Sequence, residues 1–195
     1  MTDAPTFLRQ FVQHPRLVGA VLPSGSALAR DVTASVPRTG HPVVAELGPG
    51  TGAFTRAVQQ RLAGRGHHLA IELNLEFADR LARRHPEVEV VRGDAAALAG
   101  LLADRGHPYA DVVVSGLPWA AFAADRQRAV LDGVLAGLGP AGVFTTFAYW
   151  HALSIPPARR FRRLLESRFE EVVVGRTVWR NAPPALVYHC RRPVR

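Results

Sequence analysis

The chain has 195 residues, of which 24 are basic and 16 acidic, so its formal net charge is +8. Hydrophobic residues make up 48% and charged residues 21%, a balance typical of a globular domain rather than a disordered chain. The single cysteine, Cys190, excludes an internal disulfide framework and a zinc site of several cysteines. No apolar run approaches the ~20 residues that cross a bilayer, and the first seven residues lack the basic and apolar regions of a signal peptide. We therefore expect a cytoplasmic protein.

Residues 1–41 predict a helical segment that precedes the main fold. The first predicted helix has one apolar face, formed by Phe7, Leu8, Phe11 and Val12. A second helix is predicted over Leu28–Val36.

From residue 42 onward, apolar strands alternate with amphipathic helices. The predicted strands are Val43–Leu47, His68–Leu73, Val88–Arg92, Ala110–Ser115 and Gly142–Tyr149. The predicted helices are Thr55–Ala63, Leu75–Arg84, Ala96–Ala103, Arg126–Leu138 and Ala158–Ser167. Such alternation favours right-handed βαβ units, and hence a parallel sheet with helices on both faces.

Two further strands, Glu171–Trp179 and Ala185–Arg191, close the chain with no helix between them. The short link Arg180–Pro184 lets them pair antiparallel at one end of the sheet. The sequence thus predicts an α/β fold with a seven-stranded, mostly parallel sheet and an antiparallel terminal hairpin. We expect one domain over residues 1–195, in which the core spans 42–195.

The strongest local signal is the run Glu46-Leu47-Gly48-Pro49-Gly50-Thr51-Gly52, which lies between the first strand and the following helix. Glycines let a backbone turn sharply and approach a ligand closely, and open α/β sheets bind ligands at this edge. A tight structural turn is the alternative reading. Gly48, Gly50 and Ala53 also satisfy a dinucleotide-binding pattern, so the loop alone does not name its ligand.

Acidic residues beside three successive strand ends narrow the choice. Glu72 is placed to accept hydrogen bonds from a ribose diol, and Asp94 from an adenine amino group. Glu46 lies just before the glycines, where a carboxylate suits an ammonium and a sulfonium but repels a pyrophosphate. A helix cap for Asp94 and a solvated strand end for Glu72 are the alternatives.

This arrangement resembles the S-adenosylmethionine site of class I methyltransferases, whose Rossmann-like sheet also ends in an antiparallel pair. The resemblance implies that S-adenosylmethionine is the cofactor. The residues it assigns to cofactor binding are Glu46, Gly48, Gly50, Thr51, Gly52, Glu72, Leu73, Asp94, Ala95 and Ser115.

The fourth strand is followed by Ser115-Gly116-Leu117-Pro118-Trp119. Nucleic-acid adenine N6-methyltransferases carry an Asn or Asp here, then Pro and an aromatic residue that stacks on the flipped base. This chain resembles the ribosomal-RNA adenine dimethylase superfamily but has Gly116 or Ser115 at the position of the acceptor. A nucleic-acid substrate is therefore not favoured.

The chain most resembles the small bacterial phospholipid N-methyltransferases, which methylate phosphatidylethanolamine. The resemblance includes the opening run from Phe11 to Ser24, the glycine loop, Ser115–Trp119 and the closing run from Val178 to Ala185. It implies a cytoplasmic enzyme that acts on a phospholipid at the inner face of the membrane, without a metal. A small-molecule methyltransferase, an RNA adenine methyltransferase and a non-catalytic binding module remain the alternatives.

Methyl transfer to an amine requires alignment of a neutral amine with the sulfonium methyl. An acceptor near Leu117, or the hydroxyl of Tyr149, is a candidate to orient the amine. Trp119 and Tyr149 are candidates for cation–π contact with the methylated product, and Asn181 for a polar contact with substrate. The alternatives are ordinary core aromatics and a turn residue.

Two features are candidates for membrane contact. The first is the apolar face that contains Phe7 and Phe11. The second is a basic helix on which Arg159, Arg160, Arg162 and Arg163 fall on one side. Core packing and a solvated basic face are the alternatives, and the same charge would also suit RNA.

Overall fold

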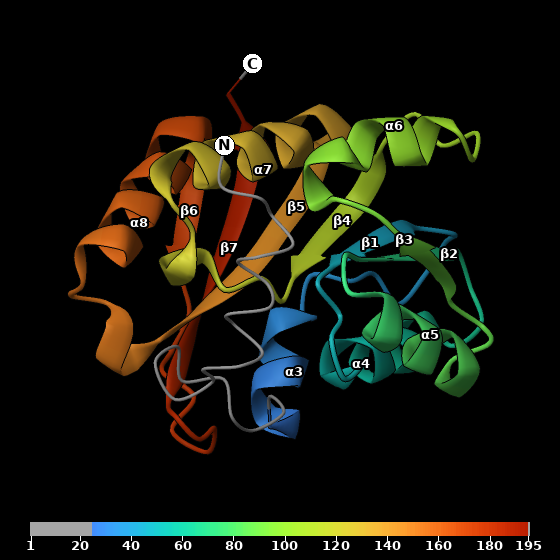
Figure 1. Ribbon diagram of the computed structural model, residues 1–195, viewed down its shortest axis with the longest axis horizontal. Helices are drawn as coiled ribbons and strands as arrows, with labels where there is room; N and C mark the ends of the chain where they lie inside the picture. Colours follow the sequence, from blue (N-terminus) through green and yellow to red (C-terminus); the bar gives the residue numbers. More distant parts are fainter. Residues whose placement is uncertain (1–24, 195) are drawn as a thin grey trace.

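The computed structural model describes residues 25–194, which form a twisted seven-stranded sheet covered by helices (Figure 1). The strands are β1 (Val43–Leu47), β2 (His67–Glu72), β3 (Glu89–Arg92), β4 (Ala110–Ser115), β5 (Leu138–Tyr149), β6 (Phe169–Val174) and β7 (Ala185–Pro193). The helices are α3 (Ser26–Val32), α4 (Ala53–Leu62), α5 (Leu75–Arg84), α6 (Leu98–Ala103), α7 (Ala124–Gly137) and α8 (Pro156–Arg168). Short 3₁₀ turns cover Ala95–Ala97, Trp119–Ala121 and Trp150–Ala152.

The sheet has the order β3-β2-β1-β4-β5-β7-β6. Strands β1 to β5 pair in parallel, whereas β7 pairs antiparallel with both β5 and β6. The predicted sheet with its antiparallel terminal pair is confirmed. Because β1 to β5 are parallel, their carboxyl ends meet at one edge, and the loops at that edge lie side by side.

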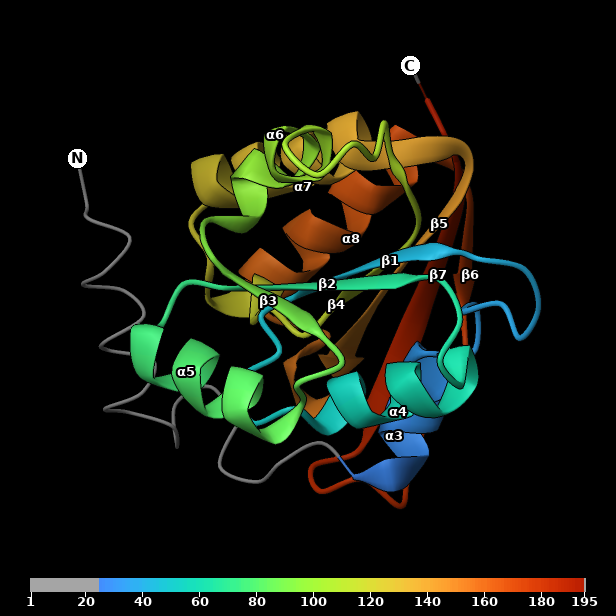
Figure 2. The same cartoon turned by 90° about the vertical axis from the view of Figure 1, so that its right-hand side faces the viewer.

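The helices form one layer on each face of the sheet (Figures 1 and 2). Alternate residues of β1 and β4 point to opposite faces, as the strand period requires. Val44, Val112 and Val114 pack with α3 and α4, whereas Ala45, Val113 and the β5 residue Phe144 belong to the core beneath α6, α7 and α8. Both faces of these central strands are buried, which explains their nearly continuous apolar sequence.

Helix α3 begins and ends earlier than predicted. It spans Ser26–Val32 rather than 28–36, because Thr33 ends it: the Thr33 hydroxyl donates to the carbonyl oxygen of Ala29, 2.8 Å away, and the chain then turns. The other predicted N-terminal helix, with Phe7 and Phe11, lies outside the described residues.

The ends of β5 and β6 also differ from the predictions. Strand β5 starts at Leu138, directly after α7, so Gly139 and Pro140 lie inside the strand rather than before it. Strand β6 spans Phe169–Val174 rather than 171–179. Beyond it, Val178 forms only an isolated bridge to Ala185, so the connection to β7 is a longer loop than predicted.

Candidate functional site

The loops at the carboxyl edge of the sheet are tied together by backbone hydrogen bonds. Three glycines each donate an N–H to the end of a neighbouring strand. The pairs are Gly48 with Ile71 (2.9 Å), Gly93 with Glu72 (3.1 Å) and Gly116 with Leu47 (2.8 Å). These bonds fix the strand ends of β1, β2, β3 and β4 relative to one another, and they place the predicted acids around one loop.

The glycine loop has the conformation that its sequence predicts. Gly48, Gly50 and Gly52 have φ values of +67°, +52° and +85°, which side chains rarely adopt. A Cβ on Gly48 would lie 2.7 Å from Leu117 Cδ2, and one on Gly52 would lie 2.9 Å from Leu81 Cδ1. At Gly50, in contrast, a Cβ would meet no atom of residues 25–194 within 4 Å. The loop is therefore packed against the protein at its ends and open at its middle.

The carboxylate of Glu72 is buried beneath this open part of the loop. It accepts hydrogen bonds from the backbone N–H of Gly50 (3.1 Å) and of Asn74 (2.9 Å). Burial raises the pKa of Glu72, and these backbone donors oppose the shift. The folded protein therefore holds a proton on Glu72 more firmly than the unfolded chain does. The contribution of Glu72 to the free energy of unfolding is thus lost as the pH rises through its pKa in the folded protein.

Two consequences follow from the bonds to Glu72. A carboxylate has about four lone-pair sites, so two accepted bonds leave room for a ligand that donates a pair of hydroxyls. The Gly50 N–H, which in a phosphate-binding loop would face the ligand, is already used by Glu72. Both features favour a ribose over a pyrophosphate at this place.

A second buried carboxylate, Glu46, lies on β1 beside α4. Its Oε2 accepts a hydrogen bond from the Thr55 hydroxyl (2.7 Å), and His68 Nε2 lies 3.2 Å from the same oxygen, at an angle poor for a hydrogen bond. The other ring nitrogen of His68 contacts Gln59 Nε2 at 2.9 Å. The second oxygen of Glu46, Oε1, is buried and has no hydrogen-bond partner within residues 25–194. A buried acceptor without a partner marks a place where a donor could bind.

Asp94 caps the 3₁₀ turn at the end of β3 and also holds an arginine. It accepts from the backbone N–H of Ala96 (2.9 Å), and Arg126 of α7 donates to both of its oxygens, at 2.8 and 2.6 Å. Arg126 and the Ala96 N–H lower the pKa of Asp94, although burial opposes them. Its side chain is still 37% exposed, so the helix cap is confirmed while the expected contact with an adenine amino group stays a prediction.

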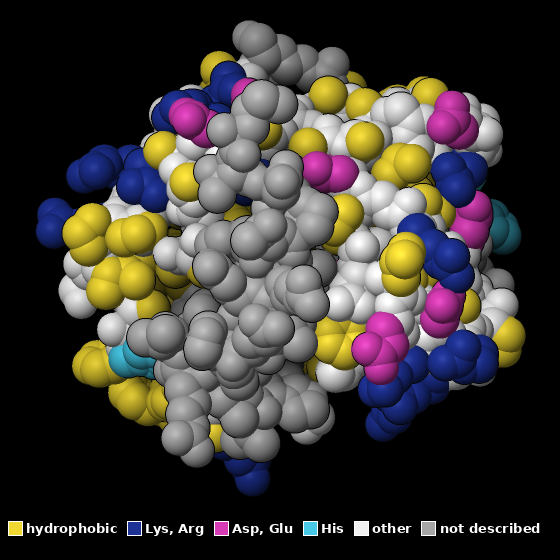
Figure 3. Space-filling view, viewed as in Figure 1, with side chains coloured by type: hydrophobic (Ala, Val, Ile, Leu, Met, Phe, Trp, Pro, Cys, Tyr) yellow, Lys and Arg dark blue, Asp and Glu magenta, His cyan; other side chains and the backbone are white. Residues whose placement is uncertain are grey.

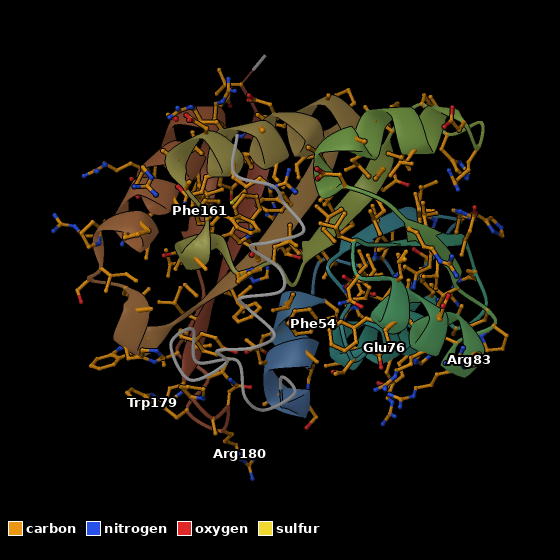
Figure 4. The ribbon with its side chains drawn as sticks, in the orientation of Figure 1. Phe54, Glu76, Arg83, Phe161, Trp179 and Arg180 are labelled. Atoms are coloured by element: carbon orange, nitrogen blue, oxygen red, sulfur yellow. The ribbon has the colours of Figure 1, made fainter. Side chains whose placement is uncertain are left out.

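The turn after β4 corrects the prediction for Trp119. This side chain is buried rather than exposed to a substrate: it stacks on Phe161 with ring centroids 4.2 Å apart, and its indole N–H donates to Ser115 Oγ (3.1 Å). Figure 4 shows Phe161 pointing inward from α8. Ser115 is fully buried as well, so its hydroxyl serves the protein interior rather than a cofactor.

Of the remaining cofactor positions, Thr51 and Leu73 are exposed, next to the loop and to Glu72 respectively. Ala95 is buried in the core at the start of a 3₁₀ turn. Only the first two have side chains that an incoming ligand could reach.

Two predicted substrate residues keep their places at the carboxyl edge. Leu117 packs against Gly48, and its carbonyl accepts from the Trp119 N–H at 3.0 Å. Tyr149 ends β5 partly buried, with its ring stacked on that of His151 at 5.8 Å. Burial raises the pKa of Tyr149, which keeps its phenol neutral around pH 7.

Asn181 is a structural residue rather than an open polar contact. Its side chain is buried, accepts from the backbone N–H of Gly25 (2.8 Å) and donates to the carbonyl of Pro183 (2.6 Å). It thus attaches the loop before β7 to the start of α3, and the turn reading of this residue is the correct one.

The basic helix α8 has three exposed arginines rather than four. Arg160 is partly buried, and it donates to Gln127 Oε1 (3.0 Å) and to the carbonyl of Phe122 (3.2 Å). Arg159 and Arg163 are exposed, and Arg162 is exposed but paired with Glu166 at 2.9 Å. The predicted set of four on one solvent-facing side is wrong for Arg160, because that side chain reaches back to α7.

The sequence did not identify three residues that bind the predicted acids. Thr55 and His68 contact Glu46, and Arg126 pairs with Asp94. Glu46 on β1 pairs with Ala70 on β2, and His68 lies two residues before Ala70. The strand register could therefore have placed His68 on the same face of the sheet as Glu46. Arg126 lies 32 residues from Asp94, and no local pattern indicates their contact.

Comparisons with known proteins agree with this geometry. The chain is 32% identical over 194 residues to an ornithine lipid N-methyltransferase from Singulisphaera acidiphila, a match that covers 98% of this chain and 97% of the relative. No protein-family model matches the chain.

Solved structures share the fold. TrmN from Thermus thermophilus is similar with a TM-score of 0.68 at 16% identity, over 90% of this chain and 51% of that chain. The O-methyltransferase TomG from Streptomyces achromogenes, in complex with S-adenosylmethionine, is similar with a TM-score of 0.65 at 17% identity, over 98% of this chain and 91% of that chain. At these identities the likeness shows the fold alone.

The close approach of the two loops gives a first prediction. A Cβ on Gly116 would lie 2.7 Å from the carbonyl oxygen of Gly48, so Gly116→Ala should destabilise the protein by about 1–3 kcal/mol, the usual cost of overpacking. Urea unfolding followed by circular dichroism measures this free energy.

The matched control is Gly100→Ala in helix α6, where a Cβ would meet no atom of the described part of the chain within 4 Å. There the substitution should stabilise the helix by up to about 1 kcal/mol. Equal unfolding free energies for the two variants would contradict the packing described for the Gly48 and Gly116 loops.

Proposed function

The chain belongs to the family of the ornithine lipid N-methyltransferase, and we propose that it transfers methyl groups from S-adenosylmethionine to the primary amine of a membrane-lipid headgroup. The observation that carries the proposal is the 32% identity, which extends over nearly the whole of both chains. The glycine loop with its buried acids supports the same cofactor independently.

The residues at the carboxyl edge fit S-adenosylmethionine. The open side of Gly50 leaves space for a ligand against the backbone, and Glu72 has free lone pairs for ribose hydroxyls. The unpartnered oxygen of Glu46 adds negative charge beneath the loop, which favours a ligand with an ammonium and a sulfonium. Asp94 would accept from the adenine amino group, and the exposed Leu73 offers apolar contact.

When bound, S-adenosylmethionine supplies an electrophilic methyl group on a sulfonium. The protein must then hold a neutral amine in line with that methyl group, which is mainly a task of orientation. The carbonyl oxygen of Leu117 and the hydroxyl of Tyr149 are the acceptors we assign to this task. Because burial raises the pKa of Tyr149, its neutral phenol orients the amine and does not act as the base.

The proposed substrate is an aminolipid, and two headgroups are candidates. The resemblance to phospholipid N-methyltransferases implies phosphatidylethanolamine, whereas the relative is named for ornithine lipid. Ethanolamine and ornithine both present a primary amine, so the acceptors at Leu117 and Tyr149 suit either.

RNA adenine methylation is less well supported. The position of Gly116 has no space for a side chain beside Gly48. The Asn or Asp that accepts from the target amine in adenine N6-methyltransferases therefore does not fit there.

We further propose that the enzyme works at the anionic cytoplasmic face of the membrane. Helix α8 carries the exposed Arg159 and Arg163, which anionic lipids would attract. Within residues 25–194, no helix is both long and apolar enough to span a bilayer.

The proposed reaction is tested directly on lipid vesicles. The purified protein is incubated with S-adenosylmethionine and vesicles that contain phosphatidylethanolamine, ornithine lipid or neither, and mass spectrometry follows the headgroups. We expect mass increases of one or more methyl groups on at least one aminolipid and none on vesicles of phosphatidylglycerol alone. Methylation of ribosomal RNA or of free amines, with both lipids unchanged, would refute the proposal.

The role of Glu72 gives a pH-dependent prediction. Calorimetric affinity for S-adenosylmethionine should fall as the pH is lowered through the raised pKa of Glu72, because only the carboxylate accepts from both hydroxyls of the ribose. Glu72→Gln should weaken binding by about 1–3 kcal/mol, since hydrogen bonds to a charged acceptor are the stronger kind, and should abolish this pH dependence.

The control is Glu76→Gln. Glu76 lies on the first turn of α5 (Figure 4). Its exposed carboxylate pairs with Arg80. This variant should keep both the affinity and its pH dependence. If Glu72→Gln binds as the unmodified protein does at every pH, Glu72 does not contact the cofactor.

A further inference from the structure

Two tryptophans stand exposed beside one another at the carboxyl edge of the sheet. Trp150 is 54% exposed and Trp179 is 67% exposed, yet their ring centroids are only 6.0 Å apart. Large apolar side chains that gather on a surface mark an interaction site more reliably than scattered ones. We call Trp150 and Trp179 the tryptophan patch.

The backbone beneath the patch is held by hydrogen bonds. Tyr149 and Val178, the residues that precede the two tryptophans, both pair with Ala185 at the start of β7. The Trp150 N–H donates to the carbonyl of Pro184 (2.8 Å), and the Val178 N–H donates to that of Ala185 (2.7 Å). The two indoles therefore project from backbone that is hydrogen-bonded to the start of β7.

The chain segments that carry the patch are basic. Residues 140–165 and 172–194 contain no Asp or Glu. Within these stretches Arg159, Arg163, Arg176 and Arg180 are all exposed. Figure 3 shows hydrophobic side chains on the lower left of this face with basic ones above and below them, and Figure 4 places Trp179 and Arg180 at its lower end.

We propose that the tryptophan patch inserts into the boundary between headgroups and acyl chains of an anionic bilayer, with the four arginines on the surrounding lipid phosphates. Tryptophan favours this boundary because its ring is apolar and its N–H is polar. Arginine near an anionic surface adds electrostatic attraction. The arginines favour an anionic surface, the exposed tryptophan pair favours the lipid boundary over an acidic protein partner, and a second copy of this chain would bring the arginines against arginines.

The inference rests on the proposed lipid methylation and adds a direction to it. The patch begins at Trp150, the residue after Tyr149, so it lies at the same edge of the sheet as the glycine loop. Insertion of the patch brings the headgroup layer to the edge where the amine must meet the methyl group. A lipid could then be methylated without leaving the bilayer completely.

Vesicle flotation tests the docking surface. The full chain is mixed with vesicles of phosphatidylcholine containing increasing phosphatidylglycerol, and the bound fraction is measured. Trp150→Ala with Trp179→Ala should weaken binding about tenfold or more, because two large apolar side chains no longer leave water. Replacement of Arg159, Arg163, Arg176 and Arg180 by Gln should remove the dependence on phosphatidylglycerol and on salt.

The matched control is Tyr109→Ala, which removes an exposed aromatic side chain (44% exposed) just before the amino end of β4, at the opposite edge of the sheet. It should leave binding unchanged. A second measurement uses the unmodified protein: brominated lipids should quench its tryptophan fluorescence. Trp150→Phe with Trp179→Phe leaves only the buried Trp119, and its emission should not be quenched.

A soluble substrate separates this inference from the function. Both the unmodified protein and the Trp150→Ala, Trp179→Ala variant should methylate a short-chain aminolipid below its micelle concentration at the same rate. If neither does, the proposed function fails. If both do, three results would overturn the docking surface. The protein does not bind vesicles, the tryptophan changes leave vesicle binding unaffected, or sedimentation shows that the unmodified protein is a dimer that the tryptophan changes dissociate.

Discussion

The structure depends on one steric constraint, the contact between two backbone turns at the carboxyl ends of β1 and β4. Gly116 approaches the carbonyl oxygen of Gly48 so closely that neither turn has room for a side chain there, and Leu117 fills the remaining space against Gly48. This contact fixes one end of the glycine loop. The middle of the loop, at Gly50, is open among the described residues 25–194, and we propose that the ligand binds there.

Electrostatics then decide which ligand suits the loop. Glycine loops before a helix commonly bind phosphate through their free N–H groups. Here Glu72 takes the Gly50 N–H, and Glu46 adds a second buried acid below the same loop. The site is thus unsuited to an anion and suited to a ligand with hydroxyls and positive charge. On the neighbouring side, β5 leads from Tyr149 directly to the tryptophan patch. The proposed places of the cofactor, the amine and the bilayer therefore follow one another along one edge of the sheet.

The sheet and its glycine loop could be predicted because they depend on local patterns. Strand alternation predicts the parallel sheet, the missing helix before β7 predicts the antiparallel terminal pair, and three closely spaced glycines predict the loop. Trp119, Arg160 and Asn181 could not be assigned, because each is decided by a partner distant in sequence. Trp119 packs on Phe161, Arg160 reaches Gln127, and Asn181 binds Gly25. The sequence does not show whether such an aromatic, basic or amide side chain faces a substrate or the protein interior.

The central claim is that the open side of the glycine loop holds S-adenosylmethionine with Glu72 on its ribose. A crystal structure of the complex tests it most directly. The account predicts that the ligand lies against Gly50, that both ribose hydroxyls are within hydrogen-bond distance of the Glu72 carboxylate, and that Glu46 lies on the side of the methionine group. A ligand bound elsewhere, or one whose ribose leaves Glu72 bonded only to Gly50 and Asn74, would contradict it.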